Sequence, residues 1–140
     1  MKKIVRYIPI PVIADIQFDK ASALGAIEAG AAAVRLNPGL ISDQKSLSEI
    51  ARAVLDKNIA VRVGANSGSI GSIEVKQRIS AGETPIEAMC SALVYGAKKQ
   101  CDMLEECGVR NIKVALKSSD VSVSCAAARK FAAMTDYPLH

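Results

Sequence analysis

Two short segments of this chain share a pattern that constrains its fold more than any other feature. In residues 33–39 (AVRLNPG) and 60–67 (AVRVGANS), apolar and polar residues alternate before a turn or a loop rich in glycine, serine and asparagine. This alternation is typical of a β-strand with one apolar and one polar face. Both strands carry an arginine and then an asparagine, in the same relative order. We therefore interpret the chain as βα repeats that aim polar side chains at one site.

The rest of the sequence alternates between strand and helix patterns. We expect strands at Ile8–Ile16, Ala32–Asn37, Ile59–Gly64 and Asn111–Lys117, and helices at about Asp19–Ala29, Asp43–Lys57, Thr84–Glu106 and Ser119–Thr135. The third helix has the clearest start, because Thr84-Pro85-Ile86-Glu87 has the form of a capping box with proline in the first turn. Residues 66–83 are expected to form a long loop with one or two helical turns, and Tyr137–His140 the beginning of another strand.

Strands and helices that alternate in this way predict parallel strands joined by right-handed crossovers, which is an α/β fold. The strands of an open, doubly covered sheet are continuous apolar runs, whereas these strands carry polar residues on one face. Those residues are Asp15, Arg35, Arg62, Lys113 and Lys117. We therefore expect a single domain over residues 1–140 that forms part of a (β/α)8 TIM barrel, with about four βα units and the helices outside.

Composition argues against several classes of protein. No run approaches the roughly 20 apolar residues of a membrane span, so we expect no membrane protein. The net charge of +4 is spread along the chain without a basic run, so we expect no binding to nucleic acid. The first residues begin like a secretory signal, but Arg6, two prolines and Asp15 interrupt the apolar stretch. A cytoplasmic location is the expectation that follows.

The cysteines also bear on function. They are Cys90, Cys101, Cys107 and Cys125, and no two of them form a close pair. Ligand sets for zinc or iron–sulfur clusters usually include such a pair, which one loop can present. We therefore expect this chain to bind no metal and no cluster by itself.

A candidate site lies where the predicted strands end, because TIM-barrel sites form at the C-terminal ends of the strands. Arg35, Arg62 and Lys117 would bring several positive charges into a mostly closed cavity, which is costly unless an anion neutralises them. A phosphate or diphosphate fits this need. Backbone amides of the loop 66–69 and nearby serine hydroxyls would complete the site. Two alternatives remain open, namely a solvated face of a half-covered sheet and an internal ion pair with Asp15.

Five segments together resemble the barrel domain of the 4-hydroxy-3-methylbut-2-enyl diphosphate synthase family of the non-mevalonate isoprenoid pathway. They are VIADIQFD, AGAAAVRLNPG, IAVRVGANSGS, GETPIEA and KVALKSSD, in the family's order from about Pro9 to His140. The resemblance implies an oxidoreductase that reductively opens 2-C-methyl-D-erythritol 2,4-cyclodiphosphate to 4-hydroxy-3-methylbut-2-enyl diphosphate. It also implies ferredoxin or flavodoxin as the electron donor.

The same resemblance implies which residues bind the substrate, and it leaves the catalytic residues unassigned. The substrate-binding residues are Asp15, Arg35, Asn37, Arg62, Asn66, Lys117 and Ser118. Asp15 would support the site and Ser118 belongs to the same strand-end motif, while the other five would hold the diphosphate. Gln17 stands where the family usually has histidine, which removes a titratable donor but keeps a hydrogen-bonding group.

A second departure from the family concerns what is missing from the chain. The family has eight barrel strands and a separate C-terminal domain whose three cysteines carry a [4Fe-4S] cluster, and neither the other strands nor that domain is found here. We therefore expect the chain alone to be inactive and its outer strands, near Val12–Ile16 and Ile112–Leu116, to have unpaired backbone groups. A homo-oligomer or a partner chain would complete the barrel. Without either, Arg35, Arg62 and Lys117 would lie in water.

Two other functions remain open from the sequence. One is a noncatalytic module that binds a phosphate-bearing ligand, or an assembly component that kept the cationic face without the redox domain. The other is a different barrel enzyme with a phosphorylated or pterin-like substrate, since pteroate synthase barrels are related.

Overall fold

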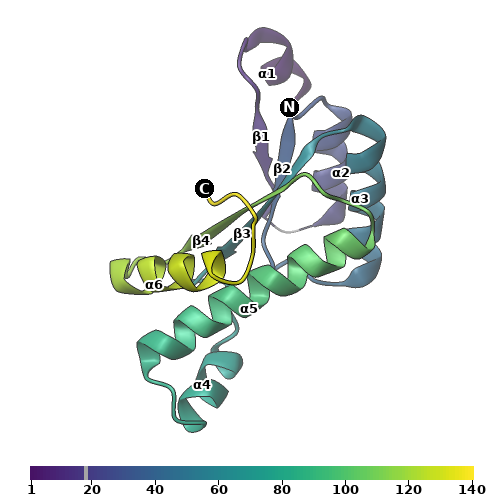
Figure 1. Ribbon diagram of the computed structural model, residues 1–140. Helices are drawn as coiled ribbons and strands as arrows, with labels where there is room; N and C mark the ends of the chain where they lie inside the picture. Colours follow the sequence, from purple (N-terminus) through teal and green to yellow (C-terminus); the bar gives the residue numbers. More distant parts are fainter. Residues whose placement is uncertain (18) are drawn as a thin grey trace.

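The computed structural model describes residues 1–17 and 19–140, and its centre is a sheet of four parallel strands. These are β1 (Ile13–Asp15), β2 (Ala33–Leu36), β3 (Ala60–Asn66) and β4 (Ile112–Lys117), paired in the order β1-β2-β3-β4 (Figure 1). Strands that are neighbours in sequence are also neighbours in the sheet, as in a TIM barrel and unlike a doubly wound sheet, whose strand order reverses. The predicted fold, part of a (β/α)8 barrel, is therefore confirmed.

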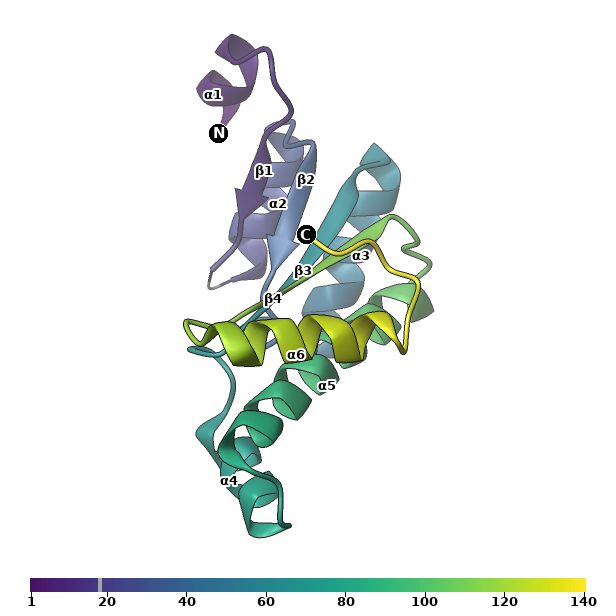
Figure 2. The ribbon, with the colours of Figure 1, turned by 60° about the vertical axis from the view of Figure 1, so that its left-hand side comes forward.

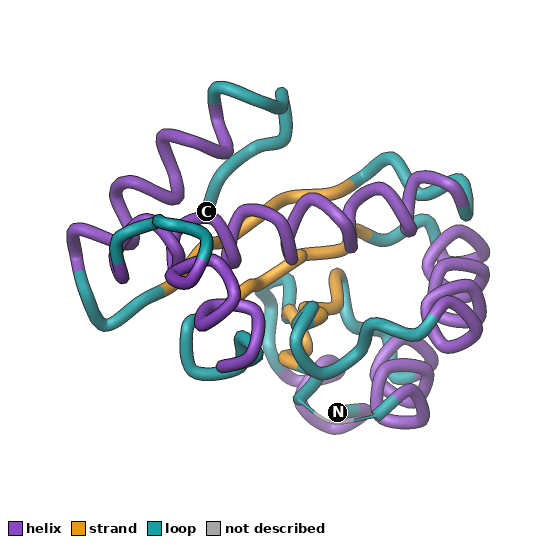
Figure 3. Tube along the Cα trace, turned by 90° about the horizontal axis from the view of Figure 1, so that it is seen from below, coloured by secondary structure: helices purple, strands orange, loops and turns teal. Residues whose placement is uncertain are grey.

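Six helices accompany the strands in the described part of the chain. They are α1 (Lys2–Tyr7), α2 (Lys20–Glu28), α3 (Gln44–Lys57), α4 (Ser72–Ser80), α5 (Pro85–Glu106) and α6 (Val121–Ala132). The helices α2, α3 and α5 lie on one side of the sheet (Figure 3), where alternate strand residues such as Val34, Val61 and Val114 are fully buried. The other face of the sheet consequently carries the residues between them, including the arginines. The helix α4 lies against α5 instead and buries none of its residues.

The helix ends follow local signals that the sequence carries. Side chains of Asp19, Asp43, Thr84 and Asp120 each accept a hydrogen bond from a backbone N–H of the first turn. Thr84 also forms the reciprocal capping box that was predicted. After α2 and α5 the chain turns at two glycines with left-handed φ of 92° and 90°, Gly30 and Gly108. These caps define where the helices begin and where α2 and α5 end.

Three sequence-based expectations are corrected by the structure. The helix α1 was not predicted, because none of its residues is buried and its sequence therefore shows no apolar stripe. The first strand is limited to Ile13–Asp15 rather than Ile8–Ile16, because Pro9 and Pro11 have no backbone N–H with which to pair with β2. Residues 72–80 form a regular helix, α4, within what was expected to be mostly a loop.

The C-terminal segment adds the beginning of a fifth strand, as predicted. Leu139 forms a parallel bridge with Val114 of β4, and Figure 2 shows this segment returning along β4. The Val114 N–H donates to the Pro138 carbonyl oxygen at 2.9 Å, and the His140 N–H donates to the Val114 carbonyl oxygen at 2.8 Å. The expectation of an unpaired outer edge is therefore wrong for the middle of β4.

Across the described residues, every helix is too short or too polar to cross a bilayer.

Phe131 anchors α6 in the hydrophobic core, because its side chain is fully buried and its ring lies 6.2 Å from the Tyr137 ring, centroid to centroid. We expect Phe131→Ala to lower the free energy of unfolding by about 3–5 kcal/mol, because it leaves a cavity in the core. Val121→Ala in the same helix is the control, because Val121 is 74% exposed. Urea unfolding measures both, and equal losses would contradict this account of the core.

Candidate functional site

The strand register brings polar residues of all four strands side by side on the face opposite the helices. Asp15 is paired with Arg35, Arg35 with Arg62, and Arg62 with Lys113, so that these four residues form one row across the sheet. We call Asp15, Arg35, Arg62 and Lys113 the charged row. Closer to the strand ends, Asn66 is paired with Lys117. The structure thus brings together strand residues that the sequence predicted to share a site.

Arg35 is the buried member of the charged row. Its side chain is 3% exposed, and its Nη1 donates to Asp15 Oδ1 at 2.8 Å, while Nη2 donates to the Gly64 carbonyl oxygen at 2.6 Å. The positive charge of Arg35 is therefore compensated within the sheet, so that the alternative of an internal ion pair holds for this arginine. The expectation that Arg35 lies in water is wrong, because its side chain lies across the sheet instead of projecting from it.

Arg62 lies directly beside Arg35 but has no such compensation. Within residues 1–17 and 19–140 it forms no ion pair, and its Nε is buried without a hydrogen-bond partner. Burial lowers the pKa of Arg62, the positive charge of Arg35 lowers it further, and Asp15 partly opposes both effects. An arginine stays protonated at neutral pH even so. The site therefore holds a positive charge whose surroundings favour an anion.

The two predicted asparagines serve the loops that follow β2 and β3. Asn37 is buried, and its Oδ1 accepts hydrogen bonds from the Gly39 N–H and the Ser69 hydroxyl, each at 3.0 Å. Asn66 Oδ1 accepts from the Gly68 N–H at 3.0 Å. Both carbonyl oxygens thus hold turns in shape, and the Asn37–Ser69 bond ties the two loops together. The amide NH₂ groups of both asparagines form no hydrogen bond with the described residues.

Lys117 and Ser118 end β4 beside the loop after β3. Lys117 is exposed, and its carbonyl oxygen accepts from the Ser67 N–H at 2.9 Å. The Ser118 hydroxyl accepts from the Asp120 N–H at 3.2 Å. Ser118 also lines a groove of about 330 Å³ together with Ser67 and Gly68 and the start of α5. The predicted loop and the predicted serine therefore meet in one groove at the strand ends.

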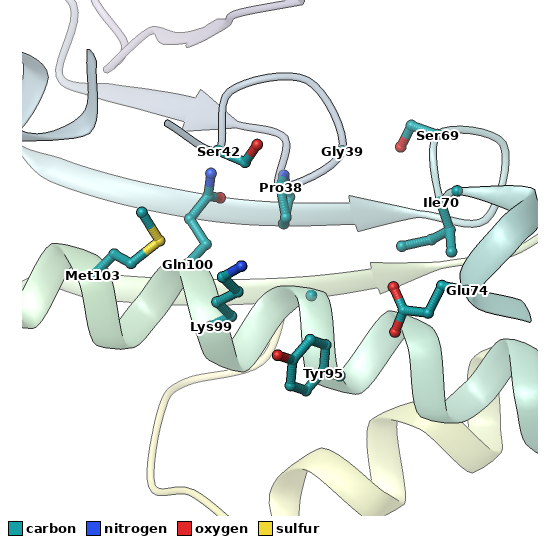
Figure 4. Close-up of a pocket in the computed structure, with 12 residues that line it drawn as sticks. Pro38, Gly39, Ser42, Ser69, Ile70, Glu74, Tyr95, Lys99, Gln100 and Met103 are labelled. Atoms are coloured by element: carbon teal, nitrogen blue, oxygen red, sulfur yellow. The ribbon is translucent and has the colours of Figure 1, made fainter. Parts of the chain in front are cut away.

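A separate cavity of about 200 Å³ lies behind the strand-end loops, between these loops and α4 and α5 (Figure 4). None of the seven predicted site residues lines it. It does share Gly39 and Ser69 with the loops that Asn37 joins. The buried Gln100 closes one side, where its Nε2 donates to the Ile41 carbonyl oxygen at 2.6 Å. This cavity therefore adjoins the strand-end loops and is separate from the charged row.

Sequence reasoning missed the structural role of two groups in the site, although it counted the serine hydroxyls of the loop after β3 among the groups that would complete it. The Gly64 carbonyl oxygen holds Arg35, and the Ser69 hydroxyl connects the loops after β2 and β3. Gly64 lies in phase with Arg62 and Asn66 on the same strand, so the alternating pattern placed it on the correct face without indicating a role. Every residue has a backbone carbonyl oxygen, so the sequence does not indicate which one accepts a hydrogen bond from Arg35.

The described residues contain no group of three histidine, cysteine or acidic side chains that could hold a metal ion. All four cysteines are free, with Cys90 and Cys101 buried and Cys125 exposed. The donor set here therefore does not fit an iron–sulfur cluster, which needs several thiolates around one point.

A family model for the GcpE TIM-barrel domain matches residues 1–140. The chain belongs to this family. A relative from Persephonella marina is 42% identical over 142 residues, covering 100% of this chain and 38% of the relative. A relative from Malacoplasma penetrans is 41% identical over 138 residues, covering 99% of this chain and 36% of the relative. Both relatives are named 4-hydroxy-3-methylbut-2-en-1-yl diphosphate synthase (flavodoxin).

A third relative with this name, from Geobacter sulfurreducens, is 42% identical over 137 residues, covering 98% of this chain and 37% of the relative. The chain thus spans little more than a third of the length of the curated relatives it matches. The family resemblance seen in the sequence motifs is confirmed over the whole chain. The membership also agrees with the sheet order, because a GcpE barrel domain requires parallel strands that are neighbours in sequence.

The environments of the cysteines predict an order of thiol reactivity. Burial raises the pKa of Cys101 to about 12 and also raises the pKa of Cys90, so that both stay as unreactive thiols at about pH 8. We expect iodoacetamide to label the exposed Cys125 first and to label Cys90 and Cys101 only after unfolding. Mass spectrometry of timed samples measures this order. Labelling of Cys101 at the rate of Cys125 would contradict the burial of the Cys101 side chain on α5.

Proposed function

We propose that this chain is the substrate-binding part of a 4-hydroxy-3-methylbut-2-en-1-yl diphosphate synthase, an oxidoreductase of isoprenoid biosynthesis. The observation that carries the proposal is the uncompensated charge of Arg62 beside the already paired Arg35, at a place where four strands present polar groups. A diphosphate supplies the missing negative charge and accepts several hydrogen bonds at once. Family membership and the names of the relatives support the same ligand.

Four of the seven predicted residues would contact the diphosphate with their side chains. Arg62 supplies a bidentate guanidinium, and Lys117 supplies a flexible point charge from the neighbouring strand end. Asn37 and Asn66 offer their amide NH₂ groups, since their carbonyl oxygens hold the loops.

Two of the predicted residues would shape the site instead of carrying its positive charge. Asp15 supports the site by holding Arg35. Ser118 joins Ser67 and Gly68 in the groove at the strand ends, where backbone amides complete the cradle.

The substrate that we propose is 2-C-methyl-D-erythritol 2,4-cyclodiphosphate, which the whole enzyme opens reductively. Flavodoxin is the electron donor that we favour, because the relatives are named for it, and ferredoxin is the alternative. A [4Fe-4S] cluster would supply electrons to the reaction, but the described residues of this chain do not fit one. We infer that the cluster is held outside the part described here, in a further domain or a partner chain.

This proposal extends to the setting of the chain. Because the sheet has four strands and a barrel of this family needs more, we propose that further strands complete it, supplied by a longer protein, a partner chain or a second copy. The location proposed is the cytoplasm.

We expect Arg62→Ala to weaken the binding of inorganic pyrophosphate by about 2 kcal/mol or more, which is about 30-fold in affinity. The reason is that Arg62 is a half-buried cation of the row that forms no ion pair within the described residues, and its guanidinium can hold a phosphate by two hydrogen bonds. Lys57→Ala, on the exposed last turn of α3, is the matched loss of one positive charge elsewhere. Calorimetric titration measures both variants, and equal losses would show that binding follows net charge and not this site.

A further inference from the structure

We infer that Gly64 is a positioning residue, whose missing side chain and carbonyl oxygen together set where the Arg35 guanidinium lies. The inference rests on the proposed function for its effect on ligand binding, and on the geometry of the sheet alone for its effect on Arg35. The function assigned to the charged row requires two arginines to coexist on adjacent strands, and Gly64 is the residue that makes room for one of them.

The space above Gly64 is occupied by one side chain. A Cβ at this position would lie 3.2 Å from both Cγ and Cζ of Arg35 and closer still to Arg35 Nε, which is nearer than real Cβ atoms come to other atoms. These are the three nearest atoms, and all belong to Arg35. The Arg35 side chain therefore lies directly over the Cα of Gly64, where any larger residue would displace it.

The backbone conformation of Gly64 does not itself require glycine. The glycines with positive φ are Gly30, Gly82 and Gly108, and Gly64 lies in the regular strand β3. Alanine can adopt a strand conformation, and glycine within a strand normally weakens it. The need for glycine at this position thus comes from the close approach of Arg35 and not from strain in the chain.

The reason that Arg35 needs this space is its neighbour. Arg35 and Arg62 are Cα partners on β2 and β3, and two like charges held at the same level repel each other. By lying over Gly64, two residues further along β3, Arg35 leans away from Arg62 toward the strand ends. There its Nη2 donates to the Gly64 carbonyl oxygen at 2.6 Å, while its Nη1 still donates to Asp15 Oδ1 at 2.8 Å. Arg62 is thereby left clear to receive the anion.

A double-mutant cycle tests this inference directly. The variants are Gly64→Ala, Arg35→Ala and the combination, each measured by thermal unfolding and by titration with inorganic pyrophosphate. We expect Gly64→Ala to lower the unfolding midpoint and to weaken pyrophosphate binding by at least about tenfold, because the guanidinium is displaced. In the Arg35→Ala background the space is empty, so that adding Gly64→Ala should lower neither quantity. Gly25→Ala is the matched control, because a Cβ there meets nothing within 4 Å.

Each outcome of the cycle decides the matter. If Gly64→Ala alone prevents folding, recovery of a cooperative transition in the double variant supports the inference, and a double variant that also fails to fold contradicts it. If Gly64→Ala lowers the unfolding midpoint equally in both backgrounds, Gly64 acts through the strand itself and not through Arg35. If Gly64→Ala changes neither the midpoint nor the affinity in the wild-type background, Gly64 does not position Arg35. Failure of the wild-type chain to bind pyrophosphate would count against the proposed function, while the unfolding cycle would still decide whether Gly64 positions Arg35.

Discussion

Two arginines at the same level on neighbouring strands are the constraint around which this sheet is arranged. Arg35 and Arg62 are direct partners in the register of β2 and β3, and their charges are compensated in different ways. Both arginines have a buried Nε without a hydrogen-bond partner in the described part of the chain. Asp15 and the Gly64 carbonyl oxygen compensate the charge of Arg35, whereas Arg62 forms no ion pair with the described residues. The same residue type therefore supports the sheet in one strand and leaves a charge for a ligand in the next.

The loops at the strand ends hold the side chains of Asn37 and Asn66 in place beside the two arginines. Asn37 Oδ1 accepts hydrogen bonds from the Gly39 N–H and the Ser69 hydroxyl, so that the loops after β2 and β3 are bonded to each other. A Cβ at Gly39 would clash with the Ser69 carbonyl oxygen, which shows how closely these loops pack. Behind them lies the cavity bounded by α4 and α5. The amide groups that we propose for diphosphate binding thus belong to side chains whose carbonyl oxygens are already hydrogen-bonded to the loops, which limits the rotamer freedom still to be lost on binding.

The sequence could predict those features that depend on local signals. The period of two placed Arg35, Arg62 and Lys117 on one face, and the capping box that begins at Thr84 was visible in the residue types. The helix α1 left no signal, because it buries none of its residues. The burial of Arg35 could not be predicted either, since it depends on the register that brings Gly64 and Asp15 within reach of one guanidinium. Residue types specify the face of a strand, but the pairing between strands decides which charge is compensated.

The central claim is that Arg62, and not Arg35, carries the charge available to a diphosphate. NMR of the arginine Nε–Hε groups during a titration with inorganic pyrophosphate tests it most directly, because it reports on each guanidinium separately. The account predicts a large, saturable shift of the Arg62 signal and a much smaller shift of the Arg35 signal, whose guanidinium is already bound to Asp15 and to the Gly64 carbonyl oxygen. A titration that moves Arg35 as strongly as Arg62, or that leaves both unchanged, would contradict it.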